Sequence, residues 1–153
     1  MEVYRLIRKK FAAELTGKGA AKFGARWNSI GTELIYTASN RSLAMAEVAV
    51  HLNLATLPTD FLMLTIEIPD YLTIDTVDLS LLPTNWNQFP HTIFTQQFGD
   101  TFVEKNQHLI LKVPSAVTKG DYNFLINPSN IEFENVKIIN SEPFPFDRRI
   151  FEK

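Results

Sequence analysis

The sequence predicts a single α+β domain in which short strands dominate. Its length of 153 residues is that of about one domain. Short apolar runs recur between turn residues, which is typical of strands, and two longer stretches have the spacing of helices. No repeat, linker or low-complexity tract divides the chain, so we expect residues 1–153 to form one domain.

Strands are predicted where β-branched and aliphatic residues alternate or cluster between breakers. The clearest run begins at Leu62 and ends at Ile68, and Pro69 and Asp70 after it suit a turn. We expect the segment after this turn to return as the partner of that strand. The predicted strands cover residues 3–7, 34–38, 62–68, 72–77, 109–113, 124–126 and 136–139.

Two helices are predicted. Residues 43–54 are apolar almost all round, so this helix should be buried on several sides, with Ser39 or Asn40 as its N-cap. Residues 92–105 have a mixed helical pattern that Gly99 weakens.

Composition excludes several classes of function. Apolar residues make up 45% and charged residues 21%, which excludes disordered and fibrous proteins. The formal net charge of −2 argues against nucleic-acid binding. The chain has no cysteine, and its three histidines lack metal-ligand spacing, so we expect no disulfide and no metal. Without a membrane-length apolar run or a signal-peptide pattern, the protein is expected in the cytoplasm, away from the membrane.

Four of the six glycines fall between Gly17 and Gly31, a window that reads as a long loop. Glycines let a backbone approach a ligand closely, and the guanidinium of Arg26, beside Asn28, can fork onto phosphate oxygens. The spacing matches neither a Rossmann nor a P-loop motif. The alternative is a loop arginine tied to backbone carbonyls.

Glu47 is the only charged residue from Leu43 to Leu52. A lone carboxylate in an apolar helix is costly unless something uses it, which makes Glu47 a candidate catalytic group. The alternative is a rim carboxylate that reaches water or pairs with Arg41 or His51.

Tyr36 and Ser115 each have a functional and a structural interpretation. The ring of Tyr36 either stacks on a planar ligand group or fills the core with its hydroxyl bonded, and Tyr4 has the same ambiguity. Ser115 follows a strand and lacks the Gly-x-Ser-x-Gly elbow of a nucleophile. It is therefore either a ligand-binding hydroxyl or a turn serine.

Taken together, these residues make the chain resemble the RES-domain toxins, a family named for its arginine, glutamate and serine. The matching segments lie in family order and span nearly the whole chain, and the ordered set is far more specific than any one segment. They are Val3-Tyr4-Arg5-Leu6, Gly19-Ala20, Gly24-Ala25-Arg26-Trp27-Asn28, Gly31, Tyr36-Thr37-Ala38, Ser42-Leu43-Ala44 with Glu47, Leu57-Pro58, Trp86, Gly99-Asp100, Val113-Pro114-Ser115-Ala116, Asn123 to Pro128, and Phe146-Asp147 with Arg149. One small departure is Ala25, where a second glycine is common.

The resemblance implies an ADP-ribosyltransferase-like fold, a central set of short strands flanked by helices, that binds NAD+ as its substrate. It implies an Xre-type helix-turn-helix antitoxin that occludes the active site, and we also consider a homodimer. The catalytic residues it implies are Arg26, Tyr36 and Glu47, and the NAD-binding set adds Ser115, with Tyr4, Gly19 and Asn28 as weaker candidates.

The implied activity is that of a bacterial type II toxin that cleaves NAD+ at the nicotinamide–ribose bond, by hydrolysis or phosphorolysis, and arrests growth by depleting NAD+. Glu47 would hold the ribose hydroxyls and stabilise the oxocarbenium-like transition state. Arg26 would bind the pyrophosphate, Tyr36 would stack near the nicotinamide ribose, and Ser115 would hydrogen-bond the nicotinamide or its ribose. Two alternatives stay open: a mono-ADP-ribosyltransferase that modifies a protein, and an inactive interaction module of the same fold.

Overall fold

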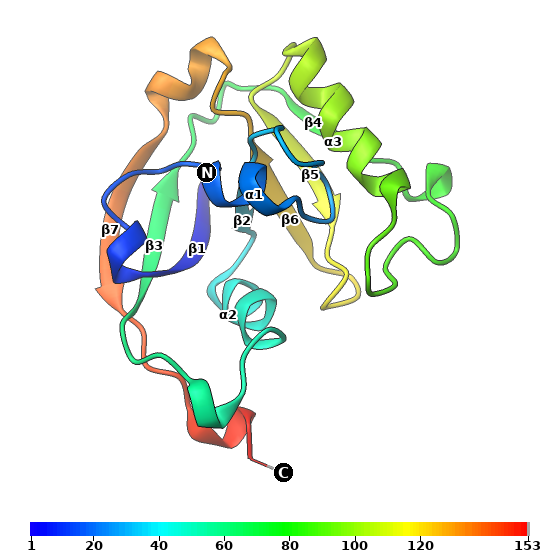
Figure 1. The fold of residues 1–153 in the computed structure, drawn as a ribbon. Coiled ribbons are helices and arrows are strands. Elements are labelled where there is room, and N and C mark those ends of the chain that lie inside the picture. Colours follow the sequence, from blue (N-terminus) through cyan, green and yellow to red (C-terminus); the bar gives the residue numbers. More distant parts are fainter. Residues whose placement is uncertain (153) are drawn as a thin grey trace.

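The computed structural model describes residues 1–152, which form a seven-stranded sheet with helices packed on it (Figure 1). The strands are β1 (Glu2–Arg8), β2 (Ile35–Ala38), β3 (Phe61–Glu67), β4 (Ile74–Thr76), β5 (Ile110–Pro114), β6 (Tyr122–Ile126) and β7 (Lys137–Pro143). The helices are α1 (Lys18–Phe23), α2 (Arg41–Ala49) and α3 (Ile93–Lys105). This arrangement confirms the predicted α+β fold. Within residues 1–152, no helix is long and apolar enough to cross a membrane.

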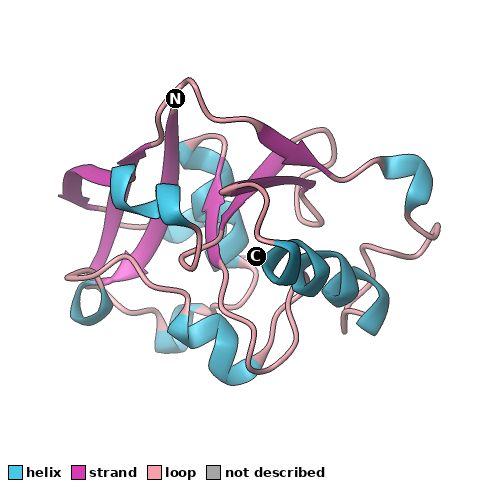
Figure 2. Cartoon of the chain, turned by 90° about the horizontal axis from the view of Figure 1, so that it is seen from above, coloured by secondary structure: helices cyan, strands magenta, loops and turns pink. Residues whose placement is uncertain are grey.

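The strand order is β4-β5-β6-β2-β1-β3-β7, and all neighbours are antiparallel except β4 and β5. Viewed from above, the strands splay into two groups instead of lying in one plane (Figure 2). One face of the sheet carries an aliphatic core cluster: Val3, Ile35, Leu64, Ile66, Ile68, Leu109, Ile110 and Ile126.

Alternate residues of the same strands form the opposite face, because successive side chains of a strand point to opposite sides. There Leu125 clusters with Phe102 of α3, and Met63 clusters with Leu43 of α2. The two helices therefore cover separate parts of one face, and the strand surface between them is left for the site.

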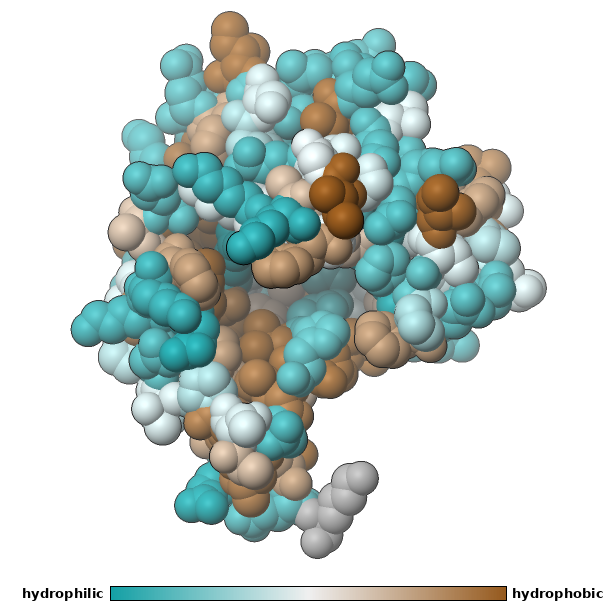
Figure 3. Space-filling view, viewed as in Figure 1, coloured by the Kyte–Doolittle hydropathy of each residue, from teal (hydrophilic) through white to brown (hydrophobic). Residues whose placement is uncertain are grey.

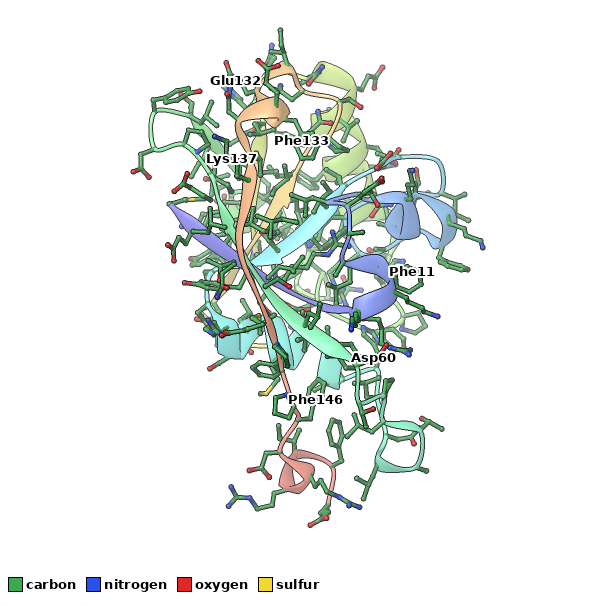
Figure 4. The ribbon with its side chains drawn as sticks, turned by 90° about the vertical axis from the view of Figure 1, so that its left-hand side faces the viewer. Phe11, Asp60, Glu132, Phe133, Lys137 and Phe146 are labelled. Atoms are coloured by element: carbon green, nitrogen blue, oxygen red, sulfur yellow. The ribbon has the colours of Figure 1, made fainter. Side chains whose placement is uncertain are left out.

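The predicted pairing of residues 72–77 with the strand at 62–68 is wrong. Strand β4 instead runs parallel to β5 at the far edge of the sheet. No edge of β3 is open to it, because β1 lies on one side and β7 on the other. Figure 4 looks onto the β7 edge, where this strand runs from Lys137 towards Phe146.

The glycine window is not the continuous loop that its composition suggests, since it contains α1. The last turn of this helix is closed from two sides, because Gly24 N and Asn28 Nδ2 both donate to Ala20 O. Gly24 then adopts φ 71° and ψ 159°, a conformation essentially restricted to glycine, which turns the chain towards Arg26.

Helix α2 is shorter and less buried than predicted. It begins after Asn40, whose side chain accepts a hydrogen bond from Leu43 N at 2.8 Å, and it ends at Ala49. Its buried residues are Leu43 and Ala44, whereas the part that carries Glu47 borders a cavity. An apolar helix need not be surrounded by core when a cavity lies beside it.

Candidate active site

A cavity of about 730 Å³ opens between α2 and the segment 24–27, over the middle of the sheet. Small-molecule sites usually measure roughly 300–1,000 Å³. The hollow is visible above α2 in the space-filling view (Figure 3). The polar and ionisable side chains on its walls include Tyr4, Arg26, Tyr36, Glu47, His91 and Asn123.

Glu47 is held by Ser115, although the two residues are far apart in the sequence. Ser115 Oγ lies 2.8 Å from Glu47 Oε1 and accepts hydrogen bonds from Val117 N at 3.1 Å and Thr118 N at 3.0 Å. Because both backbone groups donate to Oγ, the hydroxyl hydrogen is left for the carboxylate. Buried Ser115 therefore orients Glu47 from behind, while Ala116 and Val117 after it reach the cavity wall.

Arg26 faces the same cavity as Glu47. Its Nη1 donates to Trp86 O at 2.9 Å and to Gln88 O at 3.0 Å, so the loop before α3 is fastened to the arginine. Burial lowers the pKa of Arg26, and the Glu47 charge partly offsets that change. The interpretation of Arg26 as a loop arginine tied to backbone carbonyls therefore describes Nη1, while Nε and Nη2 keep three donor hydrogens.

Tyr36 presents its ring to the cavity, but its hydroxyl is used by the protein. The hydroxyl donates to Asn28 Oδ1 at 2.7 Å and accepts from Trp27 N at 3.0 Å. Burial is the main cause that raises the pKa of Tyr36. The hydroxyl therefore fixes the backbone next to Arg26 and is not offered to a ligand.

Asn28 and Gly19 do not lie on the cavity wall. Asn28 is 0% exposed, and its Nδ2 donates to Ala20 O and Thr32 O, at 2.9 and 3.0 Å. It acts on the site through Tyr36 and the shape of the loop. Gly19 lies in α1, where a Cβ atom would meet nothing within 4 Å, so no close backbone approach requires a glycine there.

Tyr4 does line the cavity, from β1. Its hydroxyl donates to Glu2 Oε2 at 3.2 Å, and the Arg41 guanidinium lies 5.9 Å from the centre of its ring. The Tyr4 ring therefore borders the cavity, while its hydroxyl is bonded to Glu2.

Sequence reasoning missed His91 and Asn123. His91 comes from the loop before α3, and Asn123 from β6, where its Nδ2 donates to Thr37 O at 3.3 Å. Asn123 alternates with buried Leu125 along its strand, and this was the available signal that it shares the inner face. For His91 the sequence carries no such signal, since an irregular loop positions it.

The arrangement joins a carboxylate and a guanidinium across one cavity. The guanidinium suits the anionic part of a ligand, and the carboxylate suits a group that develops positive charge. Among residues 1–152, no three histidine, aspartate or glutamate side chains gather as a metal site.

Comparisons with known proteins agree on one family. The model of the RES domain matches residues 2–147. The chain is 35% identical over 152 residues to Toxin Res of Photorhabdus laumondii, covering 98% of this chain and 97% of that protein. It is 32% identical over 144 residues to the Prs ADP-ribosylating toxin of Sphingobium sp., covering 93% of this chain and 89% of that protein.

The fold is similar to a solved structure, the crystal structure of the M. tuberculosis MbcT–MbcA toxin–antitoxin complex. The TM-score is 0.75 at 20% sequence identity, over 94% of this chain and 84% of that chain. At this level of identity the similarity establishes the fold alone.

Proposed function

The chain belongs to the RES domain family, as its motifs predict, and we propose that it is a bacterial toxin that cleaves NAD+ between nicotinamide and ribose. Two relatives named as toxins, one of them ADP-ribosylating, support this proposal. The observation that carries it is the Ser115-oriented carboxylate of Glu47, which shares a cavity with Arg26.

In the proposed reaction the bond between ribose C1′ and the pyridinium nitrogen breaks. Its electron pair leaves with nicotinamide, which becomes neutral and needs no general acid. Glu47 stabilises the positive charge that develops on the ribose. Because the Ser115 hydroxyl donates to Oε1, the second carboxylate oxygen can accept a hydrogen bond from a ribose hydroxyl. An oxygen of the acceptor then bonds to C1′: water releases one proton to the solvent in this step, whereas an anionic oxygen of inorganic phosphate has no proton to release.

Arg26 binds the pyrophosphate in this proposal. Both hydrogens of Nη1 go to the carbonyls of Trp86 and Gln88, so the phosphate oxygens would take the donors on Nε and Nη2. The Tyr36 ring would pack against the nicotinamide ribose, held at its far end by Asn28.

Mono-ADP-ribosylation of a protein is the second candidate. It is supported by the ADP-ribosylating relative and by exposed apolar side chains on the cavity walls, Val50 at 58% and Phe89 at 78% exposure. Such side chains suit a macromolecule that docks at the opening. The inactive-module alternative is disfavoured because Arg26, Tyr36 and Glu47 share one cavity.

We also propose that an antitoxin covers this opening. The toxin–antitoxin complex of similar fold supports such a partner. The helix-turn-helix class of that partner, its action at the active site, the cytoplasmic location and the extent of one domain over residues 1–153 are parts of the same proposal.

The test is to incubate the purified protein with NAD+ and to measure the release of nicotinamide by chromatography. Glu47→Gln keeps the size of the side chain and removes its charge, so the rate should fall on the order of 10²–10³-fold. Glu104→Gln, at an exposed position of α3, is the matched control and should retain the rate. Equal release by wild type and Glu47→Gln would refute the mechanism.

The acceptor is tested separately with labelled NAD+ in a bacterial lysate. A discrete labelled protein band supports transfer to a protein. Free ADP-ribose or ADP-ribose phosphate as the product supports hydrolysis or phosphorolysis.

A further inference from the structure

His91 lies on the cavity wall beside the residues proposed to hold the pyrophosphate. It is half-buried and lines the cavity together with Gly24, Ala25 and Arg26. Its loop is fastened to this wall, since Arg26 Nη1 donates to Gln88 O. Neither the family motifs nor the proposed mechanism gives His91 a role.

The neighbouring Gln96 determines which ring nitrogen of His91 carries the hydrogen. Gln96 Nε2 lies 3.1 Å from both Ala25 O and Asn28 O, so this atom must be the donor end of the amide. The same atom is 3.3 Å from His91 Nε2. The amide NH₂ group cannot accept a hydrogen bond, and its two hydrogens are shared among these three neighbours, so His91 Nε2 faces a donor and carries no hydrogen.

His91 is therefore a neutral imidazole with its hydrogen on Nδ1. Burial lowers its pKa, and the Arg26 charge lowers it further, which agrees with this assignment. Among residues 1–152, no protein group accepts a hydrogen bond from Nδ1. The ring thus lines the cavity wall, faces Gln96 with Nε2 and carries its hydrogen on Nδ1.

We infer that His91 is a further substrate-binding residue, whose Nδ1–H donates to the pyrophosphate of a nucleoside diphosphate that Arg26 also binds. The inference rests on the proposed function. An anion is the appropriate acceptor because the wall already carries the Arg26 guanidinium, and a charged acceptor strengthens the hydrogen bond. Nicotinamide is the less suitable acceptor, because the Glu47 carboxylate is assigned to that end of the substrate.

Two substitutions of His91 separate its proposed hydrogen bond to the ligand from its contact with Gln96. In His91→Asn, the amide nitrogen can take the place of Nδ1, so the donor is kept while the partner of Gln96 is lost. In His91→Gln, the amide oxygen can take the place of Nε2, so Gln96 keeps its acceptor while the ligand loses its donor.

Both variants are made in the full-length chain carrying Glu47→Gln, which suppresses turnover, and titrated with ADP, NAD+ and adenosine by calorimetry. We expect His91→Gln to bind ADP and NAD+ about tenfold more weakly than the parent, as for a lost hydrogen bond to a charged group. His91→Asn should bind them nearly as well as the parent. Adenosine, which has no phosphate, should be bound alike by all three proteins.

Loss of ADP binding in His91→Asn alone, or equal loss in both variants, overturns the inference. So does a loss that extends equally to adenosine. If the parent binds ADP and NAD+ and neither substitution weakens this binding, the inference fails while the proposed function stands. If the parent binds neither nucleotide, both fail.

Discussion

The Ser115→Ala substitution tests how strongly catalysis depends on the orientation of Glu47. It removes the donor 2.8 Å from Glu47 Oε1 and the acceptor of Val117 N and Thr118 N. A hydrogen bond to a charged group contributes about 1.5–3 kcal/mol, and Glu47 is only half-buried, so the lower end applies. If that free energy serves to orient the carboxylate, kcat for nicotinamide release should fall about tenfold with KM little changed.

The same substitution should also lower stability, because two backbone donors lose their acceptor. A cost of about 1–3 kcal/mol corresponds to a fall in Tm of about 2–12 °C for a domain of this size. Asn127→Ala is the control, since Asn127 is 0% exposed, bonds to Asn106 and Ser129, and is absent from the cavity wall. It should lower Tm without lowering kcat.

The two readouts can be obtained by calorimetry and by chromatography of nicotinamide at several NAD+ concentrations. A Ser115→Ala protein that loses stability as expected but keeps the wild-type kcat would refute the orienting role. Ser115 would then be a turn serine that happens to lie behind the carboxylate.

Three further predictions concern the surroundings of the site. Gly19→Ala should stabilise α1 by about 0.5–1 kcal/mol and leave nicotinamide release unchanged, because nothing lies within 4 Å of the added methyl group; a tenfold loss of rate would return Gly19 to the site. Gly99→Ala should cost about 3 kcal/mol or more in urea unfolding, because its Cβ would lie 1.6 Å from Trp27 O; near-wild-type stability would show that α3 and the Arg26 segment are not in close contact. Burial and the Arg26 charge lower the pKa of His91 in the folded protein. Below the ordinary pKa of about 6.5, the unfolded chain therefore binds more protons than the folded one. The contribution of the neutral His91 ring to stability is full above that pH and is lost as the pH falls. The free energy of unfolding should therefore decline less steeply from about pH 7 to pH 5 in His91→Gln than in wild type, and equal slopes would contradict the shift.

The sequence predicted the elements whose apolar spacing is regular. Strand β3 and helix α3 lie within about one residue of their predicted bounds, because alternation and helical spacing are local properties. The partner of β4 could not be predicted in this way, because it depends on which edges of β3 are already occupied. No local pattern contains that information.

The same division holds for the candidate site. Glu47 and Arg26 could be selected from sequence, because a charge in an apolar helix and an arginine among glycines are both locally unusual. The direction of the Ser115 hydroxyl could not be predicted from sequence, because it is determined by two backbone N–H groups that donate to Oγ in a turn. His91 was missed for a related reason, because its protonation is determined by Gln96 on another element.

The motif around Arg26 also contains a residue, Asn28, that does not line the cavity. Asn28 binds the carbonyls of the loop, and its Oδ1 receives the Tyr36 hydroxyl, while that hydroxyl in turn accepts from Trp27 N. A guanidinium on a free loop would lose side-chain and backbone entropy each time it bound an anion. Here folding has already ordered the backbone on both sides of Arg26, so more of the proposed interaction with a pyrophosphate would be available for binding. Substitution of Asn28 should therefore weaken ADP binding without removing any ligand contact, and this separates a preorganised site from one assembled by the substrate.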